Sequence, residues 1–496
     1  MIPYKTIINI DRESRIPIYI QLTNQFIKLI KSRTLLPEAK LPGSRTLADL
    51  LSLHRKTVVA CYEELILQGW AESVPQKGTF IHANLPELKQ QKLEELTGGT
   101  GNKTARFLFK RDNTLDREFP QDYDDTYMYV NDGVNDERLT PATEIGIIYR
   151  KLLGKKSSLE HFSYGTTYGS FELRETLVDY LNETRGLNIS VDNIMITRGS
   201  QMGMFLASQL LFDEGGNIIV GETNYSASDT TFEFSKATIL RVGVGDDGLD
   251  IKAIEALCKT KPVKAVYTTS HHHHPTTVTM SAQKRLQLLN LAKIHGFAII
   301  EDDYDYDFNY NQAPILPLAS HDTSGHVIYV GSICKTVAPV FRVGYLVASK
   351  DFVDECARLR RFVDRQGDAI LEITFAKFIK DGALDRHTRK AVKIYRERRD
   401  LFCKLLKEHL GAYISFEIPK GGMAIWVTLN KKYSWDQVTE VARQQKLLFV
   451  ELKRYDMANV GHNAIRIGFA RYNTDEAYEF VKRFKRTMHM IDDRLN

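Results

Sequence analysis

Three short segments near the start of the chain carry apolar residues at helical spacing. They cover residues 17–30, 44–51 and 57–68, and within each the apolar positions fall three or four residues apart. This is the pattern of an amphipathic helix that buries one face. Two strand-like runs follow at 71–74 and 79–82, on either side of a Pro-Gln-Lys-Gly turn. The pattern predicts three helices and a β-hairpin.

Turn and capping residues set the limits of these helices. Residues 36–43 contain two prolines and a glycine, which cannot continue a helix. We expect Ser44 to cap the second helix, because its hydroxyl can accept a backbone N–H. We expect Gly69 to cap the third helix at its C-terminus. Together these elements have the size and order of a winged helix-turn-helix, an α+β domain that we place at residues 12–82.

The next segment, residues 83–124, has few periodic apolar positions and contains a TGGTGN stretch. We interpret it as a linker, because a compact domain rarely leaves so long a segment irregular. As a flexible coil, the 39 residues 85–123 span about 31–37 Å, close to one turn of DNA.

From residue 125 to residue 490 helical segments alternate with short apolar runs. This alternation predicts a mostly parallel sheet flanked by helices, which is the α/β class. From about residue 380 shorter elements predict a smaller C-terminal α+β lobe, so the chain is multidomain. The expected strands of the large sheet are 193–197, 217–220, 265–268, 298–301 and 327–330, among helices such as 170–185 and 281–295; the small lobe has strands 423–428, 447–450 and 464–469 and a helix at 435–444.

Composition narrows the class of protein. With 43% hydrophobic and 26% charged residues among 496, the chain has the composition of a globular protein of several domains. No stretch approaches the roughly 18 apolar residues of a membrane span, and the start lacks the apolar core of a signal peptide. The five cysteines are scattered without a C-x-x-C pair, so we expect the reducing cytoplasm and no disulfide framework.

The net charge of +5 is unevenly distributed. Residues 1–85 hold 11 Lys and Arg against 7 Asp and Glu, which leaves only +1 for the rest of the chain. A basic N-terminal domain is expected to meet a polyanion such as double-stranded DNA. The alternative is a small helical domain with a solvated basic rim. The candidate DNA-binding residues are Arg55, Lys56 and Thr57 in the first turn of the third helix, with Arg55 or Lys56 reading guanine, Ser44 and Arg45 for phosphate, and Lys77 at the hairpin tip.

An ordered series of short matches decides between these readings. The strings LPGSRTLA at 41–48, RKTV at 55–58, YEEL at 62–65, GW at 69–70 and GTFI at 78–81 resemble the winged-helix module of the GntR family over its whole length. The resemblance implies DNA binding. One departure is His54, which stands where the family usually has a small N-capping residue.

Three polar clusters follow predicted strands in the larger region. They are TRGSQ at 197–201, EDDY at 301–304, and GSICKT at 331–336 with Arg342 a few residues on. The first places a glycine turn before a helix, which suits a phosphate. Each cluster alone could be ordinary loop or capping residues. All three at the ends of successive strands predict one cleft, because open α/β sheets bind ligands at the carboxyl ends of their strands.

This set resembles the fold-type I aminotransferases from about residue 125 to 490, and the whole chain resembles the MocR subfamily of GntR regulators. The resemblance implies pyridoxal 5′-phosphate as cofactor, with Lys335 as the lysine that forms the Schiff base. It also implies Asp302 as partner of the pyridine nitrogen and Tyr304 as the phenol near O3′. Further implied residues are Ser200, Gln201, Ser332 and Arg342 on the phosphate side, Tyr225 as the stacking aromatic ring and Arg466 for the carboxylate of an amino-compound ligand.

The segment His271–Pro275 departs from the family pattern. Where aminotransferases have Asn-Pro, this chain has His274-Pro275, so His274 takes the place of the asparagine near O3′. A run of four histidines also raises a purification tag or a metal site as alternatives. Residues on an extended segment alternate faces, so only two of the four could converge. We therefore predict no metal site and assign the run to the loop beside the cofactor.

The leading hypothesis is a transcription regulator. It would bind operator DNA through the winged helix and sense pyridoxal phosphate or an amino compound through the aminotransferase-like domain. The first alternative is a working aminotransferase with a DNA-binding appendage, and the second is a cofactor-free DNA-binding scaffold. A single winged helix covers one half-site, so a homodimer is expected.

Overall fold

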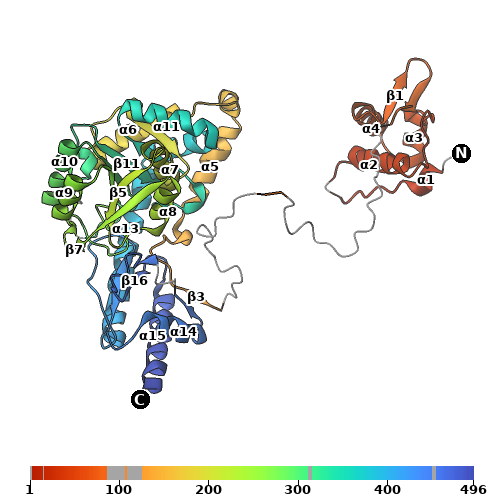
Figure 1. Ribbon diagram of the computed structural model, residues 1–496. Helices are drawn as coiled ribbons and strands as arrows, with labels where there is room; N and C mark the ends of the chain where they lie inside the picture. Colours follow the sequence, from red (N-terminus) through yellow and green to blue (C-terminus); the bar gives the residue numbers. More distant parts are fainter. Residues whose placement is uncertain are drawn as a thin grey trace. The chain divides into compact units, whose positions relative to one another are not determined.

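The computed structural model describes residues 3–14, 16–85, 107–108, 126–310, 315–449 and 454–495, without the side chain of Cys334. The chain divides into two compact units, Met1–Arg111 and Asp112–Asn496 (Figure 1). Most of the predicted linker lies outside the described residues. No helix among those described is long and apolar enough to cross a lipid bilayer.

The N-terminal unit is the three-helix and hairpin arrangement predicted from the sequence, with one additional short helix at its start. Its core is formed by the apolar faces of the helices, including Leu22, Phe26, Val58 and Leu65, closed by Ile81 of the hairpin. The elements are α1 (Tyr4–Ile7), α2 (Ile18–Lys31), α3 (Ser44–Leu51), α4 (Arg55–Leu67), and the antiparallel strands β1 (Ala71–Val74) and β2 (Gly78–Ile81).

The C-terminal unit contains a large lobe built on a seven-stranded sheet in the order β4-β12-β11-β10-β9-β5-β6. Every strand is parallel to the others except β12, which is antiparallel to both neighbours. The predicted mostly parallel sheet is therefore confirmed. The strands are β4 (Ile194–Thr197), β5 (Gly216–Gly221), β6 (Ala237–Val242), β9 (Val263–Thr268), β10 (Ala298–Asp303), β11 (Val327–Ser332) and β12 (Gly344–Val347).

Helices cover both faces of this sheet because successive strand residues point to opposite sides. One face buries Ile196, Ile299 and Tyr329 against some of the helices, and the other buries Ile300 and Val330 against the rest. The helices of the large lobe are α5 (Ala142–Leu153), α6 (Phe171–Arg185), α7 (Ser200–Leu211), α8 (Ser226–Phe234), α9 (Ile251–Thr260), α10 (Ala282–His295), α11 (Lys350–Val363) and α12 (Ala369–Lys380), with a small hairpin of β7 (Val244–Gly245) and β8 (Gly248–Leu249).

The small lobe has a three-stranded antiparallel sheet in the order β13-β14-β16, covered by helices. Two-residue strand β3 (Met128–Tyr129) pairs with β15 (Leu447–Leu448), so the first described residues of this unit belong to the small lobe. The sequence pattern did not predict that pairing. The other elements are α13 (Ala383–Leu410), β13 (Ile414–Ser415), β14 (Ala424–Leu429), α14 (Trp435–Gln444), β16 (Ala464–Gly468) and α15 (Thr474–Leu495).

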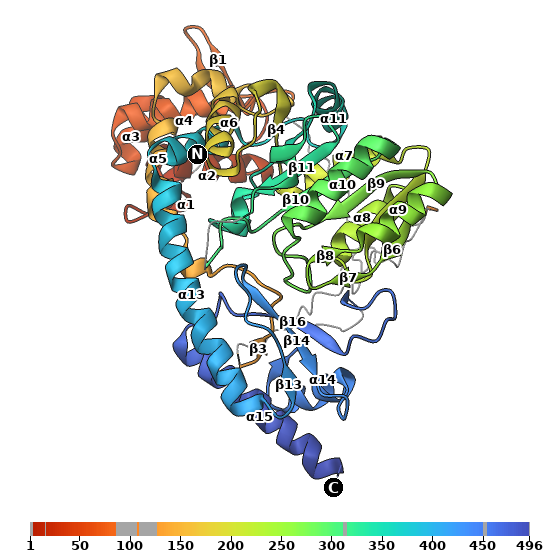
Figure 2. The ribbon, with the colours of Figure 1, turned by 90° about the vertical axis from the view of Figure 1, so that its left-hand side faces the viewer.

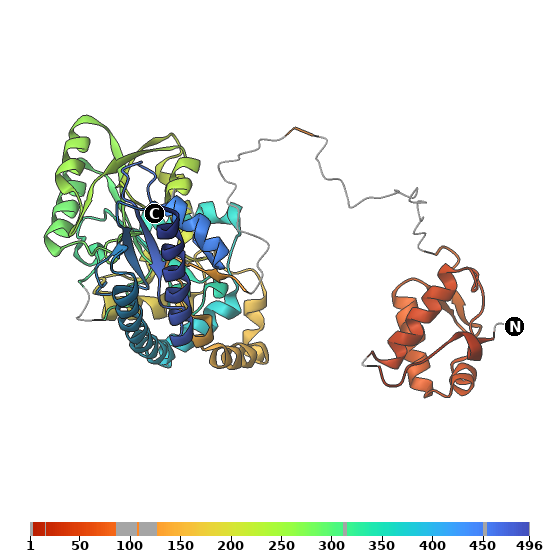
Figure 3. The ribbon, with the colours of Figure 1, turned by 90° about the horizontal axis from the view of Figure 1, so that it is seen from below.

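The long helix α13 takes part in both lobes (Figure 2). Ala383 and Leu384 at its start lie in a core of the large lobe, whereas the residues from Ala391 to Leu410 contribute to the core of the small lobe. The stretch between them, residues 385–390, has no buried side chain. Helix α15, which runs to the C-terminus marked in the left part of Figure 3, packs against α13 and α14.

Candidate functional site

The DNA-binding candidates on helices gather where α3 and α4 begin. Arg55 is the first residue of α4, and its Nε lies 3.5 Å from Ser44 Oγ, at the limit of a hydrogen bond. Arg45 and Lys56 are exposed, and Thr57 is half-buried. The structure therefore brings the predicted base-reading turn and the predicted phosphate contacts to one surface.

The structure places the caps of α3 and α4 one residue away from the positions expected for Ser44 and Gly69. Ser44 is the first residue of α3, not its cap; Gly43 holds the capping position and no side chain caps the helix. The prediction for Ser44 was therefore wrong, and its hydroxyl faces Arg55 instead. At α4, His54 is the N-cap and its Nδ1 accepts the N–H of Lys56 at 3.2 Å, so the residue that departs from the family pattern does cap. Gly69 follows the C-cap Gln68 with φ of 76°.

The hairpin adds basic side chains beside this surface. Lys77 is exposed in the turn, where its N–H donates to the carbonyl of Val74 at 3.1 Å. Lys40, which was not among the predicted residues, forms a bridge with Phe80, and its Nζ lies 5.8 Å from the centre of that ring. Its position in the turn 36–43 gave no sign of this contact, which arises from packing of the turn on β2.

In the large lobe, strand register assembles the residues predicted for the phosphate. Ser332 at the end of β11 is paired with Gly344 of β12, which is paired with Thr197 at the end of β4. A side chain at Gly344 would come within 2.6 Å of the carbonyl carbon of Gly199, so only glycine allows this approach. Helix α7 then begins at Ser200, and its free N–H groups form an anion-binding end.

Arg342 borders the same helix start. Its Nη2 donates to the carbonyl of Arg198 at 2.9 Å, and a Cβ on Gly199 would lie 3.0 Å from that nitrogen. Gln201 directs its amide nitrogen to Thr231 Oγ1 at 2.6 Å. The N-terminus of α7 therefore carries Ser200 and Gln201 and has the Arg342 guanidinium beside it.

Asp302 lies buried at the end of β10 with one oxygen engaged and one free. Its Oδ2 accepts the hydroxyl of Tyr267 at 3.1 Å, whereas its Oδ1 has no hydrogen-bond partner among the described residues. Burial, more than the neighbouring carboxylates, raises the pKa of Asp302 to about 7. An unpartnered buried carboxylate oxygen is costly and fits a ligand that brings an N–H.

Lys335 and Tyr304 face each other across this end of the sheet. Lys335 closes the short helical turn Ile333–Lys335 after β11, and its Nζ lies 5.8 Å from the centre of the Tyr304 ring. The Tyr304 hydroxyl donates to the carbonyl of His272 at 3.0 Å and accepts from Arg466 Nη2 at 3.1 Å. Its burial raises the pKa of the Tyr304 phenol, so the phenol stays protonated.

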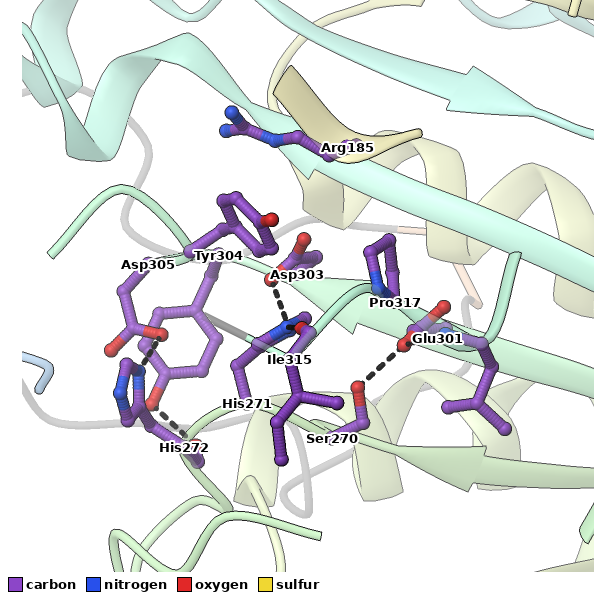
Figure 4. A network of polar contacts seen from close by, with 12 residues as sticks. Arg185, Ser270, His271, His272, Glu301, Asp303, Tyr304, Asp305, Ile315 and Pro317 are labelled. Carbon is purple, nitrogen blue, oxygen red and sulfur yellow. Dashed lines mark hydrogen bonds and ion pairs between the residues drawn. The ribbon is translucent and has the colours of Figure 1, made fainter. Parts of the chain in front are cut away.

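Each of the four histidines has a different neighbour. His271 Nδ1 lies 3.1 Å from Asp303 and His272 Nδ1 2.8 Å from Asp305, so two successive histidines meet two alternate acids (Figure 4). His273 contacts Thr276, and His274 lies 3.7 Å from Asp132. Among the residues that the structure describes, no three His, Cys, Asp or Glu side chains are placed to hold a metal ion.

These pairs belong to a buried polar scaffold beneath the site, shown in Figure 4. Glu301 accepts from Ser270 Oγ at 2.5 Å and from the backbone N–H groups of Leu318 and Ala319. Asp303 also accepts the hydroxyl of Tyr329. The scaffold fixes the loop 270–275 against β10, and with it the position of His274.

His274 stands beside Tyr225, with the two rings 5.0 Å apart and nearly perpendicular. Burial is the main reason why the pKa of His274 falls to about 4, with the nearby charge of Arg466 adding to the shift. His274 is therefore uncharged at neutral pH. Its Nδ1 is buried and has no partner among the described residues.

Arg466 on β16 is fully enclosed, at 2% exposed. Its three nitrogens donate to the carbonyl of Asp132 at 2.7 Å, to the carbonyl of Pro275 at 3.1 Å and to the Tyr304 hydroxyl at 3.1 Å. The structure therefore joins the predicted carboxylate-binding residue directly to the predicted cofactor residues, across the two lobes.

Two residues of this cluster were missed by the sequence analysis. Asp132 follows β3 in the segment that joins the small lobe, and Tyr455 lies near the start of the segment before β16. The Tyr455 hydroxyl is buried with no partner among the described residues, and its ring lies 6.3 Å from that of His274. Neither stands at the end of a predicted strand, which was the signal that identified the others.

The residues present fit pyridoxal phosphate. An amine at Lys335, the free buried oxygen of Asp302 and an anion-binding helix end are the three features that the cofactor requires. They lie at the carboxyl ends of β10, β11 and β4, of which β10 and β11 are adjacent and β4 is separated from β11 by β12.

Comparison with known families agrees with this arrangement. The family described as "Aminotransferase class I and II" matches residues 150–484, and the family described as "Bacterial regulatory proteins, gntR family" matches residues 18–81. Members of the aminotransferase class I and II fold family depend on pyridoxal phosphate, and a gntR-type domain implies DNA binding.

Relatives and solved structures share one or both parts. The chain is 23% identical over 465 residues to "Probable rhizopine catabolism regulatory protein MocR" of Rhizobium meliloti, covering 93% of this chain and 92% of the relative. It is 28% identical over 457 residues to "HTH-type transcriptional regulator TauR" of Rhodobacter capsulatus, covering 91% and 92%. The crystal structure of Pyrococcus horikoshii kynurenine aminotransferase in complex with PMP matches 75% of this chain and 92% of its own, with a TM-score of 0.69 and 28% identity. The chain thus belongs to the aminotransferase class I and II family and, through its gntR-type N-terminal domain, is a MocR-type transcription regulator.

Proposed function

We propose that this regulator binds operator DNA through the winged helix and binds pyridoxal phosphate in the large unit, where it senses the cofactor itself or an amino compound. The observation that carries the proposal is the free, buried Oδ1 of Asp302 near Lys335. A regulator without a ligand has no need of such a costly arrangement.

The chain's own residues have defined tasks in this proposal. Bound pyridoxal phosphate supplies an aldehyde for the Lys335 amine and a ring that accepts electrons. Asp302 would lie against the ring nitrogen and keep that nitrogen protonated. Tyr225, Tyr304 and His274 would line the ring and its hydroxyl, and Ser200, Gln201, Ser332 and Arg342 would hold the phosphate.

On the DNA side, Arg55 and Lys56 would enter the major groove with the first turn of α4. Thr57, Ser44 and Arg45 would contact the backbone, and Lys77 the neighbouring groove or phosphate. Such a protein works where the chromosome is, so we expect it in the cytoplasm.

Coupling between the two units requires two states that differ in ligand affinity. Lys335 would hold the cofactor, and its Nζ lies 5.8 Å from the centre of the Tyr304 ring. The Tyr304 hydroxyl is bonded to both the loop of His272 and Arg466 of the small lobe. A change in the position of the lysine side chain would therefore reach the small lobe through Tyr304.

Footprinting tests the proposal directly. The purified full chain is footprinted on the DNA that flanks its own gene, with and without pyridoxal phosphate. We expect a protected site of two half-sites whose protection changes with the cofactor. A protein that protects no DNA, or whose protection and absorption spectrum are both indifferent to pyridoxal phosphate, contradicts the proposal.

A second function is favoured by the presence of Lys335, Asp302 and Arg466 together. These residues resemble a complete aminotransferase set, so the same site could transfer an amino group. Incubating the cofactor-loaded protein with amino-acid donors and 2-oxoacid acceptors tests this, with Lys335→Ala as control. Repeated turnover that depends on Lys335 would support an enzyme; because His274 stands in place of the asparagine, we expect at most weak transamination.

We also propose a homodimer, based on an exposed apolar face. Residues 160–171 contact the end of α11 through Gly165 N–H to Gln366 and through Arg365 over the Tyr164 ring. This face borders the start of α7, where we place the phosphate, because Asp364 pairs at 2.8 Å with Arg198, which precedes that helix. A partner seated there would cover apolar side chains that are unusual on a free surface. They include Ile147, Leu159, Phe162, Tyr164, Phe171 and Phe362.

Analytical ultracentrifugation at micromolar concentration tests the dimer. We expect a dimer that Phe362→Asp converts to a monomer, while Phe234→Asp, an exposed phenylalanine on α8, leaves it intact. A wild-type monomer with full operator affinity contradicts the proposal.

A further inference from the structure

Asp132 is more accessible than either Arg466 or His274, the two groups beside it. Its side chain is 35% exposed, compared with 10% for the side chain of His274, while Arg466 is enclosed. It lies on the segment that follows β3, outside every element that carries the cofactor residues. A ligand that enters the cluster therefore meets a carboxylate before it meets the guanidinium.

The charge of Asp132 is not cancelled by its nearest neighbour. His274 Nε2 lies 3.7 Å away, beyond hydrogen-bond distance, and its lowered pKa of about 4 leaves the ring neutral at pH 7. Burial would raise the pKa of Asp132, but His274, Lys335 and Arg466 together hold that pKa below its ordinary value. Asp132 is thus ionised throughout the physiological range.

Arg466 does not use this carboxylate either. Its three described hydrogen bonds go to two backbone carbonyls and one hydroxyl, and the carbonyl of Asp132 is one of these acceptors. The backbone of Asp132 therefore serves Arg466, while its carboxylate accepts none of these three bonds and its side chain remains 35% exposed. Beside it, the Tyr455 hydroxyl is buried without a partner among the described residues.

Resting on the proposed function, we propose that the ligand carries, besides its reacting amine, a second positively charged nitrogen that Asp132 binds. Diamines and basic amino acids are the compounds of this class. The Tyr455 oxygen is available to accept a further N–H of the same group. An anion placed against Asp132 itself would meet a like charge, which disfavours ω-amino acids whose carboxylate extends to this position.

The test compares four-carbon compounds that differ at one end. 1,4-Diaminobutane, butylamine and 4-aminobutyrate are titrated into the cofactor-loaded full chain, and binding is followed by visible absorption and by calorimetry. A charge-assisted hydrogen bond predicts that the diamine binds about 10- to 100-fold more tightly than butylamine, and that 4-aminobutyrate binds most weakly. Diamines of three and five carbons are included, because chain length has to match the site.

Asp132→Asn should remove the preference for diamines, bring the diamine to the affinity of butylamine and leave butylamine unchanged. Glu137→Gln is the matched control, because this substitution also removes one negative charge from the same segment. Glu137 pairs with Arg471 on the surface. If no wild-type diamine exceeds its monoamine, or if Asp132→Asn weakens both alike, the proposal is overturned. A wild-type protein without the visible band of the cofactor would instead contradict the proposed function.

Discussion

The two units present their candidate functional residues in opposite ways. In the N-terminal unit the basic side chains of Arg45, Arg55, Lys56 and Lys77 are exposed around a core that is already closed. In the C-terminal unit Asp302, His274 and Arg466 lie inside, and the first two have buried atoms without partners. A DNA-binding surface can be complete before its partner arrives, whereas a cofactor site is incomplete until it is filled.

This difference has an energetic consequence. A buried polar atom without a partner costs about 1–3 kcal/mol. The C-terminal unit bears such costs at Asp302 and His274, and a cofactor that meets them should stabilise that unit alone. Among the described residues of the winged helix no buried side-chain polar atom lacks a partner, so the stability of this unit should not respond to the cofactor.

The largest expected effect is at Lys335. Lys335→Ala should abolish the visible absorption band of protein incubated with pyridoxal phosphate, because the covalent bond to the cofactor needs this amine. Lys350→Ala, which removes a lysine paired with Asp354 on the surface, should retain the band. Operator affinity measured without cofactor should be equal in both variants. Wild-type protein that shows no visible absorption band after incubation with pyridoxal phosphate would contradict a cofactor site in the C-terminal unit.

The next effect concerns stability and pH in the cofactor-free protein. The folded pKa of Asp302 is about 7 and its ordinary value is 3.8, so the native state holds a proton between these values that the unfolded chain releases. Stability of the C-terminal unit should therefore fall as pH rises from 4 to 7, by about 4 kcal/mol in total.

Asp302→Asn removes this penalty. The variant should be more stable than wild type at pH 8 by up to this amount and nearly equal to it at pH 4, as measured by urea unfolding of cofactor-free protein. Asp246→Asn, an exposed turn residue, should show no such pH-dependent difference. An Asp302→Asn protein that is less stable at pH 8 would contradict the burial argument.

The next prediction concerns the exposed basic side chains of the N-terminal unit. Arg55→Ala should weaken operator binding by about 1–3 kcal/mol and relax base preference, because Arg55 is placed to read a guanine. Lys77→Ala should weaken all sequences alike and reduce the salt dependence. Titrations against operator and random DNA at two salt concentrations separate these outcomes, with Lys28→Ala on α2 as control. Unchanged binding in both variants would reject the docking surface.

The smallest effect is at the cap of the reading helix. His54→Ala should cost about 1 kcal/mol, because it leaves the N–H of Lys56 without its acceptor. His54→Asn should recover that stability, since asparagine is a strong N-cap. Hydrogen exchange of the α4 amides measures both changes, and exchange in β10 should remain as in wild type. An alanine variant with unchanged α4 exchange would show that the imidazole contributes nothing to the cap.

The predictability of the two units differs for the same physical reason. The three main helices and the hairpin of the winged helix follow from periodicity and turn residues within short segments, and the sequence analysis located them; the four-residue helix α1 is too short to show a periodicity and was missed. The error at Ser44 arose at a single boundary position, where glycine took the cap. The strand ends that carry Asp302, Lys335 and the phosphate-side residues were predicted from local patterns too.

What the sequence could not reveal depends on contacts between distant segments. Asp132 reaches the site because β3, only two residues long, pairs with β15, and so short a strand has no periodicity to detect. Tyr455 and the bonds of Arg466 to Pro275 and Tyr304 depend on how the two lobes close. Which residue each of the four histidines contacts likewise depends on how the loop is aligned against β10, and this alignment cannot be read from the sequence.

Helix α13 links the two lobes mechanically. Its 28 residues form a rod of about 42 Å, anchored at one end in the large lobe and along most of its length in the small lobe. Residues 385–390 contribute no buried side chain, so neither core holds this stretch of the rod. His387, in this stretch, contacts the carbonyl of Thr336 at 2.9 Å, and Thr336 directly follows Lys335. A rotation of one lobe against the other about this stretch would therefore be transmitted to the peptide next to Lys335.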